Sequence, residues 1–110
     1  MISLKPLFEM RSSNLITMKM INSIPNTIFN NARRKSGEYR TRQEFFNYAS
    51  QTIEEIIRWN PRKLTPIVQT QKIIPLFDWG NGDICCYSLA SNKLLDFDHN
   101  NQRFVPSQWS

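Results

Sequence analysis

The amino-acid sequence predicts an α+β domain in which a small antiparallel sheet, formed by a C-terminal meander, is flanked by helices. Two observations carry this prediction. Residues 42–59 place apolar side chains on one helical face, and residues 73–99 alternate short apolar runs with tight turns. A helix followed by a meander is typical of α+β folds. Because the chain has 110 residues, we expect a single domain over 1–110.

The N-terminal segment is predicted to contain one strand and one helix. Residues 2–10 favour a short strand, and Pro6 gives it an edge position or an irregular start. A helix is expected over 14–23, where Ser12 or Ser13 could accept a hydrogen bond from a free N–H of the first turn. This part of the chain is therefore expected to add one strand and one helix to the domain.

The segment that follows Pro25 is predicted to be irregular. Pro25 stops the preceding helix because proline has no backbone N–H to donate. Residues 26–40 are polar and basic, so we expect a loop with at most one helical turn, whose basic part spans about 30–41. The residues that interrupt regular structure there are Asn30, Asn31 and Gly37.

The main helix is predicted over 42–59. Thr41 and Glu44 have the spacing of a capping box, in which each side chain accepts a hydrogen bond from a backbone N–H at the helix start. Asn60-Pro61 ends the helix, because the residue before a proline disfavours helical geometry. The apolar face of this helix consists of Phe45, Ala49, Ile53, Ile56 and Ile57.

Residues 73–99 are predicted to form a turn-linked β-unit. β-Branched and aromatic side chains over 67–77 favour extended chain, and Trp-Gly-Asn-Gly at 79–82 supplies residues that tolerate a positive φ. Two further strands are expected at 83–89 and 94–99, joined by a turn at 91–93. No element is expected over 104–110.

Charge is distributed unevenly along the chain. Residues 1–72 carry a formal charge of +7 and residues 73–110 a charge of −2, which gives the net +5. No apolar run approaches the about 20 residues that a membrane-spanning helix needs. Charged residues also interrupt the N-terminus before an export signal could form. We therefore expect a cytoplasmic protein that does not enter a membrane.

Cysteine and histidine usage argues against a disulfide, a metal site and a bound cofactor. Cys85 and Cys86 are adjacent, and neighbouring side chains of a strand point to opposite faces, so a bond between the two is not expected. His99 is the only histidine, and no C-x-x-C pair is present. We interpret both cysteines as apolar strand residues.

One acidic segment imitates a calcium-binding loop. Asp96, Asp98 and Asn100 match the first, third and fifth ligand positions of such a loop. However, Asn101 stands where the loop needs glycine, and Ser107 stands where it needs glutamate. The motif fails at both demanding positions, and calcium binding is not predicted.

Nothing in the sequence predicts an enzyme. Asp98 and His99 could be taken for a catalytic pair, but adjacent strand residues face opposite ways, so Asp98 is poorly placed to orient the imidazole. No nucleophile elbow and no phosphate-binding loop is present.

Trp79 is the most informative candidate for binding. It stands in a glycine-flanked turn between Asp78 and Asp83, where an indole can remain partly exposed. A partly exposed tryptophan beside acidic groups is typical of a binding anchor. The alternative is a turn tryptophan that folds back to cover the sheet edge, and the sequence favours neither.

Taken together, residues 74–87 and the ending Phe97-Asp98-His99 resemble the SUKH superfamily, named for yeast cell-wall-synthesis regulators and bacterial immunity proteins. The resemblance implies a central antiparallel sheet flanked by helices and a non-catalytic role. Many bacterial members neutralise a toxin by direct binding. The chain departs from the family at both ends, where an N-terminal and a C-terminal helix are missing, so it looks like a shortened member. The partner-binding positions that the motif implies are Asp78, Trp79, Gly80, Gly82, Asp83, Asp98 and His99.

The expected function is therefore a protein-binding module, with an immunity protein as the specific hypothesis and no small-molecule substrate. The alternative is a nucleic-acid-binding protein, because a dense basic run can neutralise phosphates. Only Tyr39 interleaves that run with an aromatic ring, which favours a solvated loop. The basic residues are Arg33, Arg34, Lys35, Arg40 and Arg42.

Overall fold

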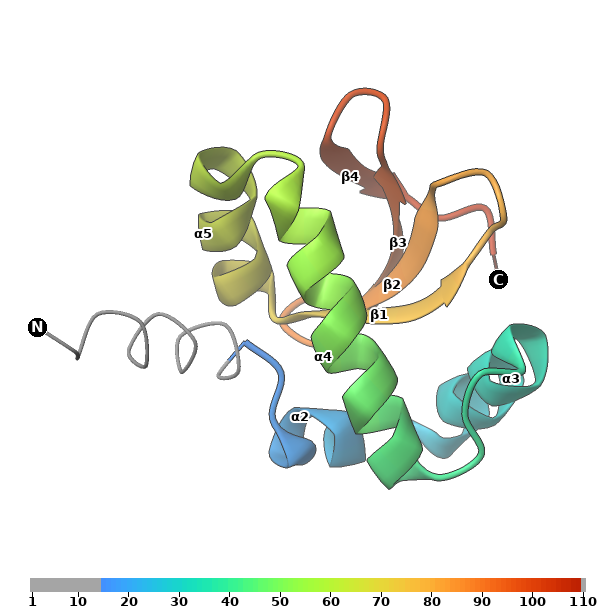
Figure 1. Ribbon diagram of the computed structural model, residues 1–110. Coiled ribbons are helices and arrows are strands. Elements are labelled where there is room, and N and C mark those ends of the chain that lie inside the picture. The colour runs from blue at the N-terminus through green and yellow to red at the C-terminus, as the bar shows by residue number, and fades with distance from the viewer. Residues whose placement is uncertain (1–14, 110) are drawn as a thin grey trace, which may run out of the picture.

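Figure 1 shows the computed structural model of the chain, which describes residues 15–109. The described part begins with helices and ends with a sheet, so the predicted α+β class is confirmed. The helices are α2 (Met18–Ser23), α3 (Asn26–Ser36), α4 (Arg42–Arg58) and α5 (Pro61–Gln71). The strands are β1 (Ile73–Asp78), β2 (Ile84–Ser88), β3 (Lys93–Asp98) and β4 (Arg103–Pro106).

The sheet is the antiparallel meander that the sequence predicts, with strand order β1-β2-β3-β4. β2 is buried along its whole length, which explains why its sequence is apolar without alternation. The β1–β2 register shifts between Pro75 and Phe77, and this irregularity lets proline lie within the pairing. In β2 and β3, Ile84 lies opposite Phe97. The unit predicted over 73–99 thus forms three of the four strands.

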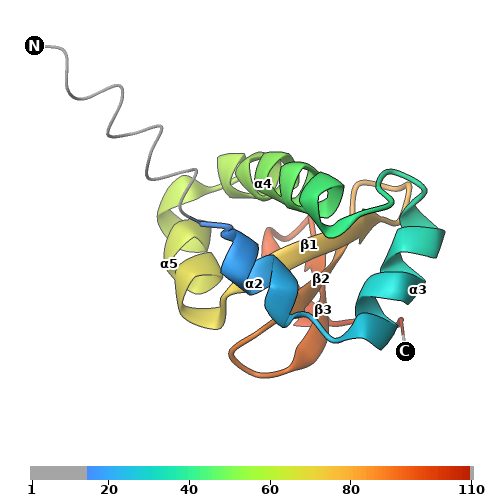
Figure 2. The same cartoon turned by 90° about the horizontal axis from the view of Figure 1, so that it is seen from below.

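Helix α4 lies along one face of the sheet, with α5 toward one end of the sheet and α3 toward the other in both views (Figures 1 and 2). The core lies between α4 and the strands. Phe45, Ile53 and Ile56 of α4 are fully buried there, together with Phe97 of β3. The apolar face of the main predicted helix is therefore the face that packs on the sheet.

The capping box of α4 forms as predicted. Oγ1 of Thr41 accepts a hydrogen bond from the Glu44 N–H at 3.1 Å, and Oε1 of Glu44 accepts one from the Thr41 N–H at 3.4 Å. The same Glu44 oxygen accepts from the Arg40 N–H at 2.7 Å. Residues 42–58 are helical and Trp59 is the C-cap, in agreement with the predicted span.

The loop predicted over 26–40, with its basic part at 30–41, is wrong over 26–36, which form α3, whereas residues 37–41 are irregular as expected. Phe29 and Ala32 turn inward, and the Phe29 ring centroid lies 5.7 Å from that of Phe45. Gly37 ends the helix with a φ of +70°. Packing of one short apolar face stabilises this helix although its composition is polar.

The extended chain predicted from residue 67 is also wrong up to residue 71, because 61–71 form α5. Oδ1 of Asn60 accepts a hydrogen bond from the Lys63 N–H at 3.3 Å, and Pro61 occupies the first helical position, where its missing N–H costs nothing. Leu64 and Val68 are buried. Their contacts hold the helix despite Pro66 in its interior.

Two further corrections concern the ends of the described chain. The helix expected over 14–23 begins at Met18, and Thr17 caps it by accepting a hydrogen bond from the Met20 N–H at 3.1 Å. The predicted strand over 2–10 and the proposed caps at Ser12 and Ser13 lie outside the described residues.

At the C-terminal end, β4 was not expected. It begins at Arg103 and pairs antiparallel with β3, with Phe104 opposite Phe97. No helix within residues 15–109 combines the length and the apolar content needed to cross a bilayer.

Candidate functional site

The connection between β1 and β2 is a tight turn whose polar groups bond to one another. The Trp79 N–H donates to the Asp83 carbonyl at 2.9 Å, and Oδ1 of Asp78 accepts from the Gly80 N–H at 2.6 Å. Gly80 adopts a φ of +96° and Gly82 one of +99°, which other residues rarely adopt. Asp78, Gly80 and Gly82, three residues of the predicted site, therefore shape the turn itself.

This turn holds His99 at the end of β3. Nδ1 of His99 lies 2.6 Å from Oδ1 of Asp83, and the His99 N–H donates to the same oxygen at 3.1 Å. A β-carbon at Gly82 would lie 2.8–2.9 Å from three atoms of the His99 ring, so only glycine leaves room for the imidazole. The Trp59 ring packs beside the His99 ring at a centroid distance of 5.8 Å, with the two rings tilted by 56°. The structure thus brings Gly82 and Asp83 of the β1–β2 turn together with His99, which directly follows β3.

The side chain of Asp98 does not bond to its neighbour His99 but to the turn that follows. Its side chain accepts hydrogen bonds from the backbone N–H of Asn100 at 3.0 Å and of Asn101 at 3.3 Å, and from Nδ2 of Asn101 at 2.8 Å. These donors, led by the Asn101 amide, lower the pKa of Asp98 below its usual value. Asp98 therefore fixes the turn between β3 and β4. The carboxylate that orients His99 is Asp83, a pairing that the sequence analysis missed.

Asp83, Asp98 and His99 also form the one group of potential metal ligands in the described part of the chain, with ligand atoms within 4.8 Å of one another. An Asp₂His set is chemically suited to divalent transition metals. However, Oδ1 of Asp83 already accepts from the His99 N–H, and both Asp98 oxygens accept from the 98–101 turn. Oδ1 of Asp83 and both oxygens of Asp98 are therefore already engaged in hydrogen bonds within the fold.

Trp79 folds back onto the sheet. Its Nε1 donates to Oδ1 of Asp96 at 2.9 Å, and its ring meets Phe77 edge-on at a centroid distance of 5.0 Å. Nζ of Lys35 lies 5.5 Å from the centroid of the indole. The half-buried indole thus adopts the second of the two arrangements considered from the sequence, and its one polar atom is occupied.

The exposed aromatic residue is Trp59, which the sequence analysis treated only as the end of the main helix. It retains 52 % of its surface and is the only large hydrophobic residue exposed within residues 15–109. The sequence did contain a signal for this exposure. Trp59 follows Arg58 at the end of a helix whose apolar face is already complete without it.

A cleft of about 340 Å³ lies between α4, the end of α3 and the ends of β1 and β2 that the turn connects. We call it the α4 cleft. None of its lining residues is basic, and three of them are acidic. Burial, opposed in part by a hydrogen bond to Thr52, raises the pKa of Tyr48 to about 12, so its phenol stays protonated at neutral pH. The cleft is lined by Ser36, Glu38, Tyr48, Gln51, Thr52, Glu55, Asp78 and Ile84.

The basic residues of the nucleic-acid alternative have separate roles in the fold. Arg42 donates to the Ile21 carbonyl at 2.7 Å and lies over the Phe29 ring. Lys35 lies over two aromatic rings, and Arg34 donates to Oδ1 of Asn31 at 2.6 Å. Nucleic-acid binding stays a prediction, and Arg33 and Arg40 complete the run on which it depends.

The groups that nucleophilic chemistry would need lie apart. Cys85 and Cys86 are free and fully buried. Burial raises the pKa of the Cys85 thiol to about 12 and that of Cys86 well above its usual value. Within the described chain, the only side chain that bonds to the His99 ring is Asp83, so the imidazole has no hydroxyl or thiol to activate.

A scan of the chain against protein-family models found no match, and neither did searches among curated proteins and solved structures.

Proposed function

We propose that the chain is a non-catalytic protein-binding module that resembles the SUKH superfamily and acts as an immunity protein against a bacterial toxin. The observation that carries the proposal is the exposed Trp59, which packs beside the His99 ring, and this ring is held by Asp83 and Gly82. We call these four residues the Trp59 platform. It presents a large aromatic surface on an ordered support.

An ordered aromatic residue with free surface is the common anchor of protein interfaces. Tryptophan contributes much of the binding energy at such sites, because burying its ring removes a large apolar area from water and orders few torsion angles. Trp59 already has half of its surface against the fold. A partner that covers the exposed half of Trp59 would bury the whole ring, and the polar groups around the ring would form the rim of the interface.

The hydrogen bonding of the SUKH-like residues also favours binding over catalysis. Asp78, Asp83 and Asp98 accept hydrogen bonds from backbone N–H groups of the two turns. Trp79 donates to Asp96. Groups that are engaged in this way set the shape of a surface, whereas a reactive centre needs a nucleophile within reach of a base.

The immunity hypothesis rests on the resemblance and on charge. The turn and hairpin region of 73–110 has a formal charge of −2 in a chain of +5, which suits a basic partner. In this proposal the toxin is met in the cytoplasm, where an immunity protein binds it before it acts. No membrane and no small-molecule substrate take part.

The test is a binding measurement with the protein encoded beside this gene. Full-length chain and partner are mixed in a calorimeter, and Trp59→Ala is compared with the wild type. We expect at least a tenfold loss of affinity, because an anchor tryptophan contributes more than about 2 kcal/mol. Arg58→Ala is the matched control, since Arg58 is its exposed neighbour at the helix end. Equal affinities for wild type and Trp59→Ala would refute the platform.

A further inference from the structure

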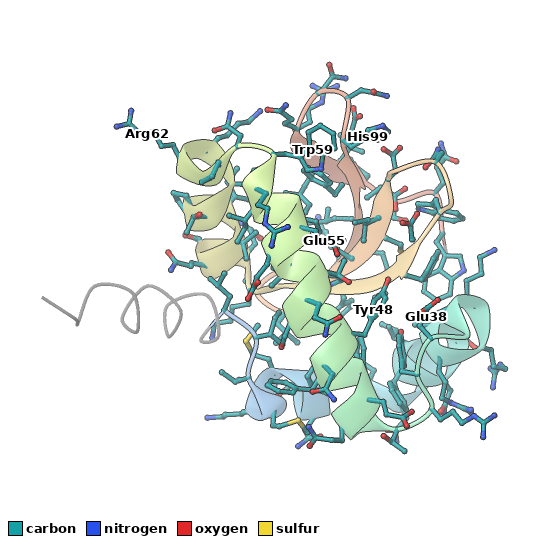
Figure 3. The ribbon with its side chains drawn as sticks, in the orientation of Figure 1. Glu38, Tyr48, Glu55, Trp59, Arg62 and His99 are labelled. Atoms are coloured by element: carbon teal, nitrogen blue, oxygen red, sulfur yellow. The ribbon has the colours of Figure 1, made fainter. Side chains whose placement is uncertain are left out.

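One stripe of α4 joins the Trp59 platform to the α4 cleft. Tyr48, Thr52, Glu55 and Trp59 follow one another at steps of three and four residues, and therefore lie along one side of the helix. Figure 3 shows Tyr48, Glu55 and Trp59 succeeding one another along α4, with Glu38 across from Tyr48 and His99 beside Trp59. From residue 48 to residue 59 this stripe spans about 16 Å. We call the stripe and the cleft together the α4 groove.

The groove has the opposite charge to the molecule. Glu38, Glu55 and Asp78 line it from three separate segments of the chain, whereas the whole chain carries +5. None of the three forms an ion pair with a described residue, and the only ion pair found within 15–109 is Asp83 with His99. The three carboxylates are exposed at the cleft, so their like charges act together on a cation that enters it.

Nearby basic side chains do not fill the groove. Lys35 lies over the rings of Phe77 and Trp79. Arg62, at the start of α5, points away from the line of Tyr48, Glu55 and Trp59 (Figure 3). No basic residue lines the cleft, so its carboxylates are open to a ligand from outside.

We propose that the α4 groove binds an extended, basic segment of the protein partner, with an arginine or lysine in the cleft and a neighbouring side chain against Trp59. This inference rests on the proposed function and specifies the partner by its chemistry. A nucleic acid is disfavoured at this surface, because its phosphates would meet three carboxylates. The remaining occupant to test is a second copy of this chain, which is itself basic.

The dimensions and groups of the groove suit such a segment. An extended chain rises about 3.3 Å per residue, so about five residues cover the stripe. A guanidinium can donate to two carboxylates at once, and a cation or an alkyl stem can lie on the Trp59 indole. The protonated Tyr48 phenol adds one donor for a backbone carbonyl of the segment.

The test uses a peptide as the probe, so it does not depend on finding the partner. The pentapeptide Arg-Gly-Arg-Gly-Arg is titrated into the ¹⁵N-labelled full chain at low ionic strength and followed by NMR. We expect shifts of the Trp59 indole N–H and of the Glu38, Glu55 and Asp78 amides. The corresponding glutamate peptide is expected to cause none.

Matched variants test which carboxylates bind the arginine peptide. Glu55→Gln should raise the Kd for the arginine peptide about fivefold, and Glu55→Gln with Asp78→Asn by a larger factor, as expected for partly exposed charge pairs. Glu54→Gln is the control, because Glu54 is adjacent and absent from the cleft lining. Binding of the arginine peptide to the wild-type chain should weaken as salt is added.

Three results would overturn the inference. One is the absence of shifts in the groove with the arginine peptide, and another is an equal effect of the Glu54 and Glu55 variants. The third is concentration-dependent dimerisation that Glu55→Gln abolishes, which would make a second copy the occupant. In each case the proposed function can still stand, because it is judged separately by the effect of Trp59→Ala on binding of the partner.

Discussion

The imidazole of His99 lies against the α-carbon of Gly82, with room for a hydrogen there and none for a methyl group. A β-carbon at this position would meet Cε1, Nδ1 and Nε2 of the ring at 2.8–2.9 Å. The β1–β2 turn and the end of β3 therefore fit each other through one glycine. The same ring bonds to Asp83 through Nδ1 and packs beside Trp59. The contact between Gly82 and His99 therefore supports the Trp59 platform.

The first prediction compares two glycines that have similar φ angles but different surroundings. Gly80 has a φ of +96° with open space around it, and Gly82 a φ of +99° with His99 in contact. Gly80→Ala should cost about 1–3 kcal/mol from backbone strain alone. Gly82→Ala should cost at least about 1 kcal/mol more, because the methyl group displaces the imidazole. Urea unfolding of the two variants measures the difference.

A double-mutant cycle identifies the contact behind that difference. When His99 is first changed to Ala, the extra cost of Gly82→Ala over Gly80→Ala should disappear, since no ring remains to collide with the methyl group. Strictly additive free energies for Gly82→Ala and His99→Ala would show that the ring and the glycine are not coupled.

The second prediction separates two tryptophans by their effect on stability. Trp79→Ala should lower the free energy of unfolding by about 2–4 kcal/mol, because the indole packs on Phe77 and satisfies Asp96. Trp59→Ala should change it by less than about 1 kcal/mol, since half of that side chain is exposed. Denaturant titrations of both variants test this order, and a reversed order would contradict the assignment of Trp59 as the exposed ring.

The sequence predicts those parts of the fold that local chemistry determines. The capping box of Thr41 and Glu44 and the glycines of the 78–83 turn act within a few residues, so their patterns can be read directly. The elements α4, β1, β2 and β3 follow from them. The Trp59 platform could not be predicted in this way, because Trp59, His99 and Asp83 come from separate elements.

The missed helices are stabilised by tertiary contacts that no local pattern reveals. Helix α3 carries a polar, basic sequence and owes its stability to the burial of Phe29 and Ala32. Helix α5 contains Pro66 and β-branched residues, which favour extended chain, yet Leu64 and Val68 hold it in the core. In α3 packing outweighs a propensity difference of a few tenths of a kcal/mol per residue, and in α5 it also offsets the cost of an interior proline, about 3 kcal/mol.

The third prediction concerns acid and the turn capped by Asp98. Hydrogen bonds from Asn101 and Asn100 lower the pKa of Asp98 below its usual 3.8. A lowered pKa in the folded state means that the ionised carboxylate stabilises the fold above that usual value, and that this contribution is lost as the pH falls through the lowered value.

Asp98→Asn keeps an acceptor but cannot ionise. The gap in melting temperature between wild type and Asp98→Asn should therefore be constant above about pH 5 and should shrink as the pH falls below about 4. Thermal unfolding followed by circular dichroism at several pH values measures the gap. A gap that stays constant down to pH 2 would mean that the cap does not depend on the charge.

The last prediction uses the two buried thiols to report on the C-terminal segment. A thiolate is the reactive form, and burial raises the pKa of Cys85 to about 12 and that of Cys86 well above its usual value. At pH 8 neither should react with a disulfide reagent while the chain is folded. Both should react when it is unfolded in guanidinium chloride.

Cys85 should be the first of the two to react during local opening. Its Sγ lies 3.6 Å from Oγ of Ser107, and that hydroxyl donates to Asp96 at 2.8 Å. Ser107→Ala removes this bond, so the segment after β4 should open more often and Cys85 should be labelled faster. Cys86 should keep its rate, because its Sγ bonds to the Ile84 carbonyl within β2 at 3.6 Å and has no bond to Ser107. Equal acceleration of both thiols in Ser107→Ala would instead indicate that labelling follows global unfolding and that the 107–109 segment does not open by itself.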